Sequence, residues 1–119
     1  MSHYSRTGIM IKPVYWLGDS RKAVRAFSSA GRRKTGIERF ALQLGAQPSD
    51  WKPMRAVGPA VSEIRIHAEV EYRVIYVAKF KEAIYVLHAF TKKSTETSLH
   101  DVRLARRRYH DLMAQREAR

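Results

Sequence analysis

The hydrophobic pattern of this chain changes its period near residue 60, and that change limits the folds open to it. From there on, apolar residues recur with the two-residue period of strands, in the runs Val61–His67, Tyr72–Phe80 and Ile84–Phe90. These runs are rich in Val, Ile and Tyr, and only the short link Lys81–Glu82 separates the last two. We therefore predict a meander of antiparallel strands in the second half of the chain.

The first half has a helical pattern instead. Asp19 is suited to cap a helix over Ser20–Ser28. A second helix follows, which begins either at a capping box formed by Thr35–Glu38 or earlier, near Arg32. Gly45 is a suitable residue to close it. The apolar residues at helical spacing in this second helix are Ile37, Phe40, Ala41 and Leu44.

A third helix is predicted near the C-terminus, after the cap motif formed by Ser98 and Asp101. Its apolar stripe consists of Val102, Ala105, Tyr109 and Leu112. Near the start of the chain the apolar run Lys12–Leu17 predicts a first strand, and the proline-rich residues 47–59 predict a loop. This order indicates an α+β fold, in which a curved antiparallel sheet packs on an N-terminal helical hairpin and a basic helix follows.

The 119 residues fit one domain, which we place at residues 1–119, with residues 1–9 as a flexible leader. The chain has no cysteine, which excludes disulfides, zinc–thiolate sites and cysteine nucleophiles. It shows no apolar run long enough to cross a bilayer and no signal-peptide pattern. We therefore expect a cytoplasmic protein with no membrane partner.

The charge balance points to a polyanionic partner. Lysine and arginine number 23 against 11 acidic residues, which gives a formal net charge of +12. A field of this sign attracts polyanions over a long range. The composition therefore favours nucleic acid or an acidic protein as the partner over a basic surface that only aids solubility.

Six short segments, in order and with short gaps, carry a family likeness: Lys12–Gly18, Ala41–Gly45, Lys52–Met54, Glu63–Arg65, Tyr72–Tyr76 and Val86–Lys93. Together they resemble the phage-derived branch of the HigB-like toxins, in the RelE/ParE superfamily of type II toxin–antitoxin systems. The likeness runs from about Lys12 to Met113. The link Ser94–Thr97 is shorter than in many relatives and lacks their proline.

The resemblance implies a RelE-like fold and an endoribonuclease, an mRNA interferase that binds the ribosomal A site, cleaves mRNA there and inhibits translation. It implies as partners a cognate helix-turn-helix antitoxin, the ribosome and mRNA, with no small-molecule cofactor. It also implies a start near Met10. Two alternatives stay open, which are a ParE-like toxin that inhibits DNA gyrase and an RNA-binding module without catalysis.

Basic residues on and after the strands are the main candidates for catalysis. Cleavage of RNA by its 2′-hydroxyl develops negative charge, which arginine and lysine stabilise. Arg65 and Arg73 lie on predicted strands, and Lys92 and Lys93 follow the last strand directly. The alternative for the arginines is a surface ion pair with a nearby glutamate, and for the lysines a solvated turn. The family likeness favours the functional interpretation.

His88 and Tyr76 complete the catalytic candidates. A lone histidine in an apolar strand, such as His88, is more often a core residue than a base. Tyr76 is also expected in the core, unless it stacks on a flipped base or donates a proton. The five histidines fall in no metal-ligand spacing, so we expect no metal and no cofactor.

Two basic clusters on the helices are expected to contact RNA. Their members are Arg32, Arg33, Lys34, Arg106, Arg107 and Arg108. The alternatives are a solvated helix face, whose aliphatic stems cover apolar surface, and the docking of an acidic antitoxin segment.

Overall fold

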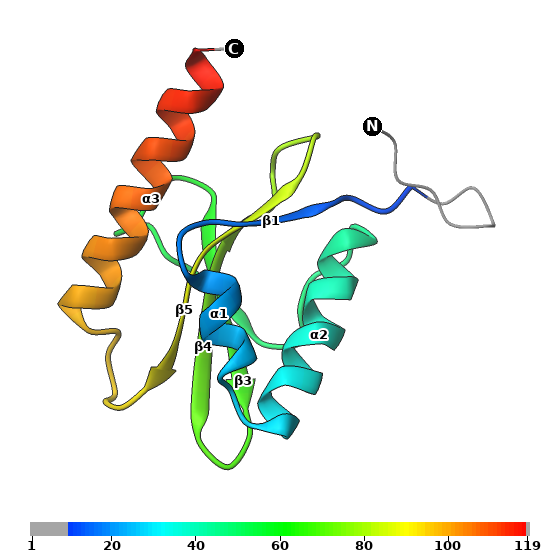
Figure 1. The fold of residues 1–119 in the computed structure, drawn as a ribbon, viewed down its shortest axis with the longest axis vertical. Coiled ribbons are helices and arrows are strands. Elements are labelled where there is room, and N and C mark those ends of the chain that lie inside the picture. Colours follow the sequence, from blue (N-terminus) through cyan, green and yellow to red (C-terminus); the bar gives the residue numbers. More distant parts are fainter. Residues whose placement is uncertain (1–9, 119) are drawn as a thin grey trace.

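The computed structural model describes residues 10–118, and over this range it forms one five-stranded sheet with helices on both faces (Figure 1). The strands are β1 (Val14–Trp16), β2 (Trp51–Pro53), β3 (Val61–His67), β4 (Glu71–Val77) and β5 (Ile84–Lys92). The helices are α1 (Ser20–Arg25), α2 (Ser29–Gln43) and α3 (Leu99–Glu117). The expected leader, residues 1–9, lies outside the described residues.

The strand order is β1-β5-β4-β3-β2, and the sheet is mixed. The meander β3–β4–β5 is antiparallel as predicted, and β3 has the predicted bounds. The expectation of a wholly antiparallel sheet is wrong at β1, which pairs in parallel with β5. The expectation of a loop over residues 47–59 is wrong in part, because Trp51–Pro53 pairs with Ser62–Ile64 as the edge strand β2.

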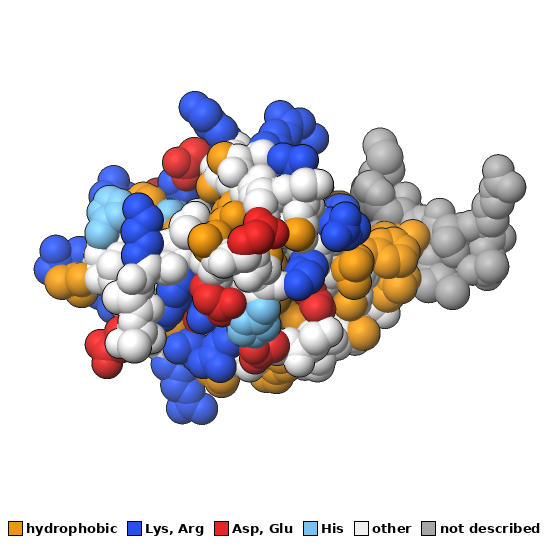
Figure 2. All heavy atoms as spheres, turned by 90° about the horizontal axis from the view of Figure 1, so that it is seen from below, with side chains coloured by type: hydrophobic (Ala, Val, Ile, Leu, Met, Phe, Trp, Pro, Cys, Tyr) orange, Lys and Arg blue, Asp and Glu red, His pale blue; other side chains and the backbone are white. Residues whose placement is uncertain are grey.

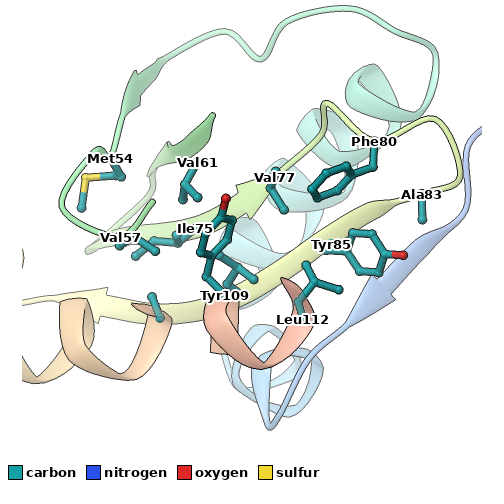
Figure 3. Packing of buried hydrophobic residues seen from close by; sticks show 12 residues of the cluster. Met54, Val57, Val61, Ile75, Val77, Phe80, Ala83, Tyr85, Tyr109 and Leu112 are labelled. Carbon is teal, nitrogen blue, oxygen red and sulfur yellow. The ribbon is translucent and has the colours of Figure 1, made fainter. Parts of the chain in front are cut away.

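Each face of the sheet has its own hydrophobic core. On one face Phe27 and Leu42, from the helical hairpin, pack with Ile64, Ile66 and Val74. On the other face α3 packs its apolar stripe, as predicted for Ala105, Tyr109 and Leu112, against β4, β5 and the loop before β3 (Figure 3). The sheet therefore separates the α1–α2 side from the α3 side (Figure 1).

The observed helix caps agree with the sequence-based prediction at α3 and differ from it at α1 and α2. Ser98 caps α3 and accepts a hydrogen bond from the Asp101 amide, as predicted. In α2 the cap is Ser28, which accepts from the Gly31 amide at 3.1 Å. Thr35 lies inside this helix and donates to the Gly31 carbonyl, so the predicted capping box is wrong. Asp19 precedes α1 without a side-chain cap bond, and this helix ends at Arg25 because the turn to the Ser28 cap follows.

Helix α2 is rotated about its axis relative to the orientation that its apolar spacing suggests. Its residues Ile37, Phe40 and Leu44 are 63%, 48% and 45% exposed. The side that faces the sheet carries Gly31 instead, where an added Cβ would lie 2.6 Å from the Tyr72 ring. A small residue at this contact lets the helix approach the sheet closely, so backbone proximity decides the rotation. Gly45 ends this segment with φ +86°, which confirms its predicted role.

None of the helices within residues 10–118 is both long enough and apolar enough to span a membrane.

Candidate functional site

A group of charged side chains lies at one end of the sheet, on the face that packs α3. Strand pairing places Lys52 opposite Glu63, and it places Arg65 opposite Arg73. We refer to six of these residues together as the charged cluster: Lys52, Glu63, Arg65, Glu71, Arg73 and Lys92. Residues opposite each other or two apart on a strand share a face, so all six project to the same side. Figure 2, which views the end with the β3–β4 turn, shows Lys and Arg around acidic side chains.

Glu63 is the buried centre of this cluster, with no exposed surface. Its Oε2 accepts a hydrogen bond from the Thr97 hydroxyl at 3.0 Å. Its Oε1 lies 3.6 Å from Arg73 Nε and 3.8 Å from Lys52 Nζ. A buried carboxylate is stable only when cations and donors compensate it. Glu63 therefore positions Lys52, Arg73 and Thr97 of the link between β5 and α3 next to one another.

The two strand arginines face each other, an arrangement of like charges that by itself destabilises a sheet. Flanking carboxylates offset this repulsion. Arg73 donates to Glu71 at 3.1 Å, and Arg65 Nη1 lies 3.8 Å from Asp50 Oδ1. The Nε atoms of both arginines are buried and lack a hydrogen-bond partner within the described part of the chain. Unsatisfied donors of this kind lower stability, and where a protein keeps them a functional role is one explanation.

His67 joins the carboxylates that hold the two arginines. Its Nε2 lies 2.6 Å from Asp50 Oδ2 and its Nδ1 lies 2.7 Å from Glu71 Oε1. These hydrogen bonds, the one to Asp50 first, raise the pKa of the imidazole. The same contact with His67 lowers the pKa of Glu71. His67 therefore fixes the acidic partners of Arg65 and Arg73 through contacts at both of its ring nitrogens.

Lys92 lies at the end of β5, opposite Glu71. Its ammonium donates to the Thr95 carbonyl at 3.0 Å. Burial lowers the pKa of Lys92, and the nearby cations of Arg73, Lys52 and Arg65 lower it further against the attraction of Glu63. Its neighbour Lys93 is exposed. The structure thus brings Arg65, Arg73 and Lys92 together, as expected of a common site.

His88 lies on the same face but is tied into a separate network. Its Nε2 lies 2.7 Å from Asp101 Oδ1, and its Nδ1 lies 3.5 Å from an Arg108 nitrogen. Arginine can only donate, so the contact with Arg108 makes Nδ1 the acceptor and leaves Nε2 to donate to Asp101. The ring also stacks on Phe90, the residue opposite Arg73. His88 therefore connects the first turn of α3 to the strand beside the charged cluster.

Tyr76 lies on the opposite face of the sheet from Arg73. It belongs to the core beneath the helical hairpin and is 3% exposed. Burial raises the pKa of its hydroxyl, against the effect of a hydrogen bond with Ser62. The structure therefore does not bring Tyr76 together with the charged cluster.

The helix residues predicted to contact RNA differ in whether their side chains form hydrogen bonds with the rest of the protein. Arg108 donates to the Leu87 carbonyl at 2.9 Å and to Asp19 at 2.7 Å, so it ties α3 to β5 and to the start of α1. Arg106 binds the Ala56 carbonyl. Lys34 donates to the carbonyl of His67.

The remaining members of these basic clusters lie on two helices. Arg32 donates to the carbonyls of Arg25 and Phe27, both at 3.3 Å. Arg33 and Arg107 are exposed.

Five residues of the site were not among the sequence-based candidates: Asp50, Lys52, Glu63, His67 and Glu71. Lys52 lay in the expected loop, and only its pairing in β2 reveals that it faces Glu63. Asp50, just before this strand, was missed for the same reason. The sequence analysis expected a nearby glutamate only as a surface ion-pair partner of the arginines, whereas Glu63 is completely buried. Within residues 10–118, no group of three acidic or histidine side chains is arranged to hold a metal ion.

The chain matches a known protein family over residues 22–110, which is more than half of its length. The family is described as "Phage derived protein Gp49-like (DUF891)". The matched range includes the whole charged cluster and more than half of α3. No curated protein matches the chain. The chain therefore belongs to the Gp49-like family of phage-derived proteins, a RelE-like toxin family of toxin–antitoxin systems.

Proposed function

We propose that this protein is a ribosome-dependent endoribonuclease, a toxin that cleaves mRNA and so stops translation. The observation that carries the proposal is the charged cluster, in which four cations from four adjacent strands surround one buried carboxylate. Fixed cations of this kind suit a reaction that builds negative charge on phosphate. Family membership supports the toxin class, and the net charge of +12 supports an RNA target.

In the proposed reaction the 2′-oxygen of one nucleotide attacks the adjacent phosphorus, and the bond from phosphorus to the next 5′-oxygen breaks. The products are a 2′,3′-cyclic phosphate and a 5′-hydroxyl. Arg65 and Arg73 stabilise the charge on the phosphate oxygens. Lys92, whose pKa is lowered, donates a proton to the leaving 5′-oxygen, and the proton of the 2′-hydroxyl passes to water.

The proposal divides the other candidate residues by location. Tyr76 has no part in cleavage, because it lies across the sheet from Arg73. His88 has a positioning role, because protein groups contact both ring nitrogens. The exposed Lys93 and Arg107 contact ribosomal RNA and contribute to affinity.

The test is single-turnover cleavage of mRNA on saturating amounts of programmed ribosomes. Arg65→Ala and Lys92→Ala are each expected to slow cleavage by about 10²–10³-fold, with much smaller losses of ribosome affinity. The matched control is Lys81→Ala, which removes an exposed lysine from the β4–β5 link and should leave the rate unchanged. Circular dichroism establishes that each variant is folded.

A ParE-like gyrase inhibitor and a simple RNA-binding module are the competing functions. Either would leave mRNA intact on programmed ribosomes at every toxin concentration. Absence of cleavage by the wild-type protein, together with inhibition of gyrase supercoiling, would replace the nuclease with the gyrase inhibitor. Cleavage that survives both Arg65→Ala and Lys92→Ala would show that the charged cluster is not the active site.

A further inference from the structure

Helix α2 carries an apolar stripe that nothing in the described chain covers. Ile37, Phe40 and Leu44 are spaced three and four residues apart, so they lie on one side of the helix. All three are about half exposed or more. Scattered apolar residues on a surface are ordinary, but a run along one helix face typically marks an interaction site.

Beside this stripe, α1 and α2 enclose a groove rich in arginine. Its volume is about 250 Å³, and the residues that line it are Trp16, Arg21, Val24, Arg25, Arg32, Thr35, Gly36 and Arg39. None of these described lining residues is acidic. Arg39 donates to Gln43 and Arg32 to two carbonyls, so their guanidinium groups are held in place. The groove therefore combines four cations with the apolar lining residues Trp16 and Val24.

Gly36 connects the groove to the apolar stripe, because it lines the groove and precedes Phe40 by one helical turn. Glycine inside a helix is less stable than alanine by about 1 kcal/mol. At Gly31 the structure explains this cost through the contact with Tyr72, but an added Cβ at Gly36 would meet nothing within 4 Å. Among residues 10–118 nothing gives Gly36 a packing reason to lack a side chain, and this absence fits close approach by another molecule.

We propose that this surface, the arginine groove together with the α2 stripe, binds an acidic amphipathic helix of a partner protein. Apolar side chains of the partner cover Phe40 and Leu44, and its carboxylates pair with the groove arginines. Guanidinium groups match carboxylates in a bidentate geometry. A second copy of this chain would bring like charges together, and an RNA backbone would leave the apolar stripe uncovered. At one end of the stripe, Ile37 lines a pocket together with Asp50, Arg65 and His67. The test below measures binding alone, so the inference does not rest on RNA cleavage.

The test uses a fluorescein-labelled synthetic peptide with leucines at helical spacing and glutamates elsewhere, and it measures fluorescence anisotropy. A scrambled peptide of the same composition reports attraction by charge alone. We expect the amphipathic peptide to bind at least about tenfold more tightly than the scrambled one. Phe40→Ser/Leu44→Ser and Arg25→Gln/Arg39→Gln should each abolish this difference.

Two further variants separate docking from folding and from net charge. Gly36→Leu fills the space beside the groove with a good helix former, so it should preserve thermal stability while weakening peptide binding. Arg55→Gln/Arg103→Gln removes the same charge from exposed positions elsewhere and should leave binding nearly unchanged.

Several outcomes would overturn the proposal. Equal affinity for both peptides would mean that only the overall charge attracts them. Dimerisation of the wild-type chain that Phe40→Ser abolishes would identify a second copy as the occupant. Binding of oligouridylate that depends on Phe40 and Leu44, with no preference for the amphipathic peptide, would identify RNA.

Discussion

The buried ion pair between Glu63 and Arg73 gives a quantitative test of how the charged cluster is held. Arg73→Met keeps the side-chain volume but removes the nearer of the two cations beside a carboxylate with no exposed surface. Breaking a buried pair by removing one partner typically costs 3–5 kcal/mol. Lys52 and the Thr97 hydroxyl still compensate Glu63, so we expect the lower end, about 3 kcal/mol.

The partner variants complete a double-mutant cycle. Glu63→Leu leaves Arg73 paired with the half-exposed Glu71, so we expect a smaller loss of about 1–2 kcal/mol. The double variant Glu63→Leu/Arg73→Met replaces the pair by apolar side chains, which is often neutral or stabilising. It should therefore unfold within about 1 kcal/mol of the wild type, while losing RNA cleavage.

Urea unfolding followed by circular dichroism measures all four free energies of unfolding, provided that the transitions are two-state. The coupling between the two sites, the sum of the two single losses minus the loss in the double variant, should be about 3–6 kcal/mol, far above the value for independent positions. Losses that simply add, or a cost below about 1 kcal/mol for Arg73→Met, would refute the account of Glu63 as a compensated buried charge. A double variant that still cleaves RNA would remove Arg73 from the proposed mechanism.

Three further predictions concern packing and pH. Leu112→Ala should lower the free energy of unfolding by about 2–5 kcal/mol, because this side chain is buried between α3 and the sheet; urea unfolding measures the loss. Gly31→Ala should destabilise through its clash with the Tyr72 ring, whereas Gly36→Ala should stabilise by about 1 kcal/mol; opposite shifts in melting temperature check the pair. His67 has a raised pKa, so its stabilisation is complete below the unfolded pKa and is lost as pH rises through the folded pKa. Unfolding free energies across neutral pH should therefore decline less in His67→Gln than in the wild type.

Sequence patterns predicted two kinds of element correctly. These are strands whose side chains alternate regularly between apolar and polar, and helices whose caps are formed by residues close together in the chain. The bounds of β3 follow from strict alternation, and the start of α3 follows from a cap that spans three residues. The two-residue period of a strand also predicts that Arg73 and Tyr76, which are three residues apart on β4, project to opposite faces of the sheet. The face of Tyr76 was therefore predictable from the sequence alone.

Non-local contacts explain what the sequence did not predict. The pairing of β2 places Lys52 beside Glu63, and a three-residue edge strand with a proline has no clear local signal. The rotation of α2 depends on the contact between Gly31 and Tyr72, which are far apart in the chain. Apolar spacing alone selected Ile37, Phe40 and Leu44, and it cannot distinguish a core-facing stripe from one that faces a partner.

The features that reduce the stability of this fold gather at the two proposed sites. Arginine opposite arginine, exposed apolar side chains on a helix and a helical glycine without a packing role are each unfavourable for folding. Departures of this kind from local consistency are expected where function requires them. The arginine groove lies between α1 and α2, but the stripe on α2 reaches the edge of the charged cluster, where Ile37 lines a pocket with Asp50, Arg65 and His67. A partner that extends along the stripe past Ile37 would therefore meet Asp50 and His67, the groups that hold Arg65 and its neighbour Glu71.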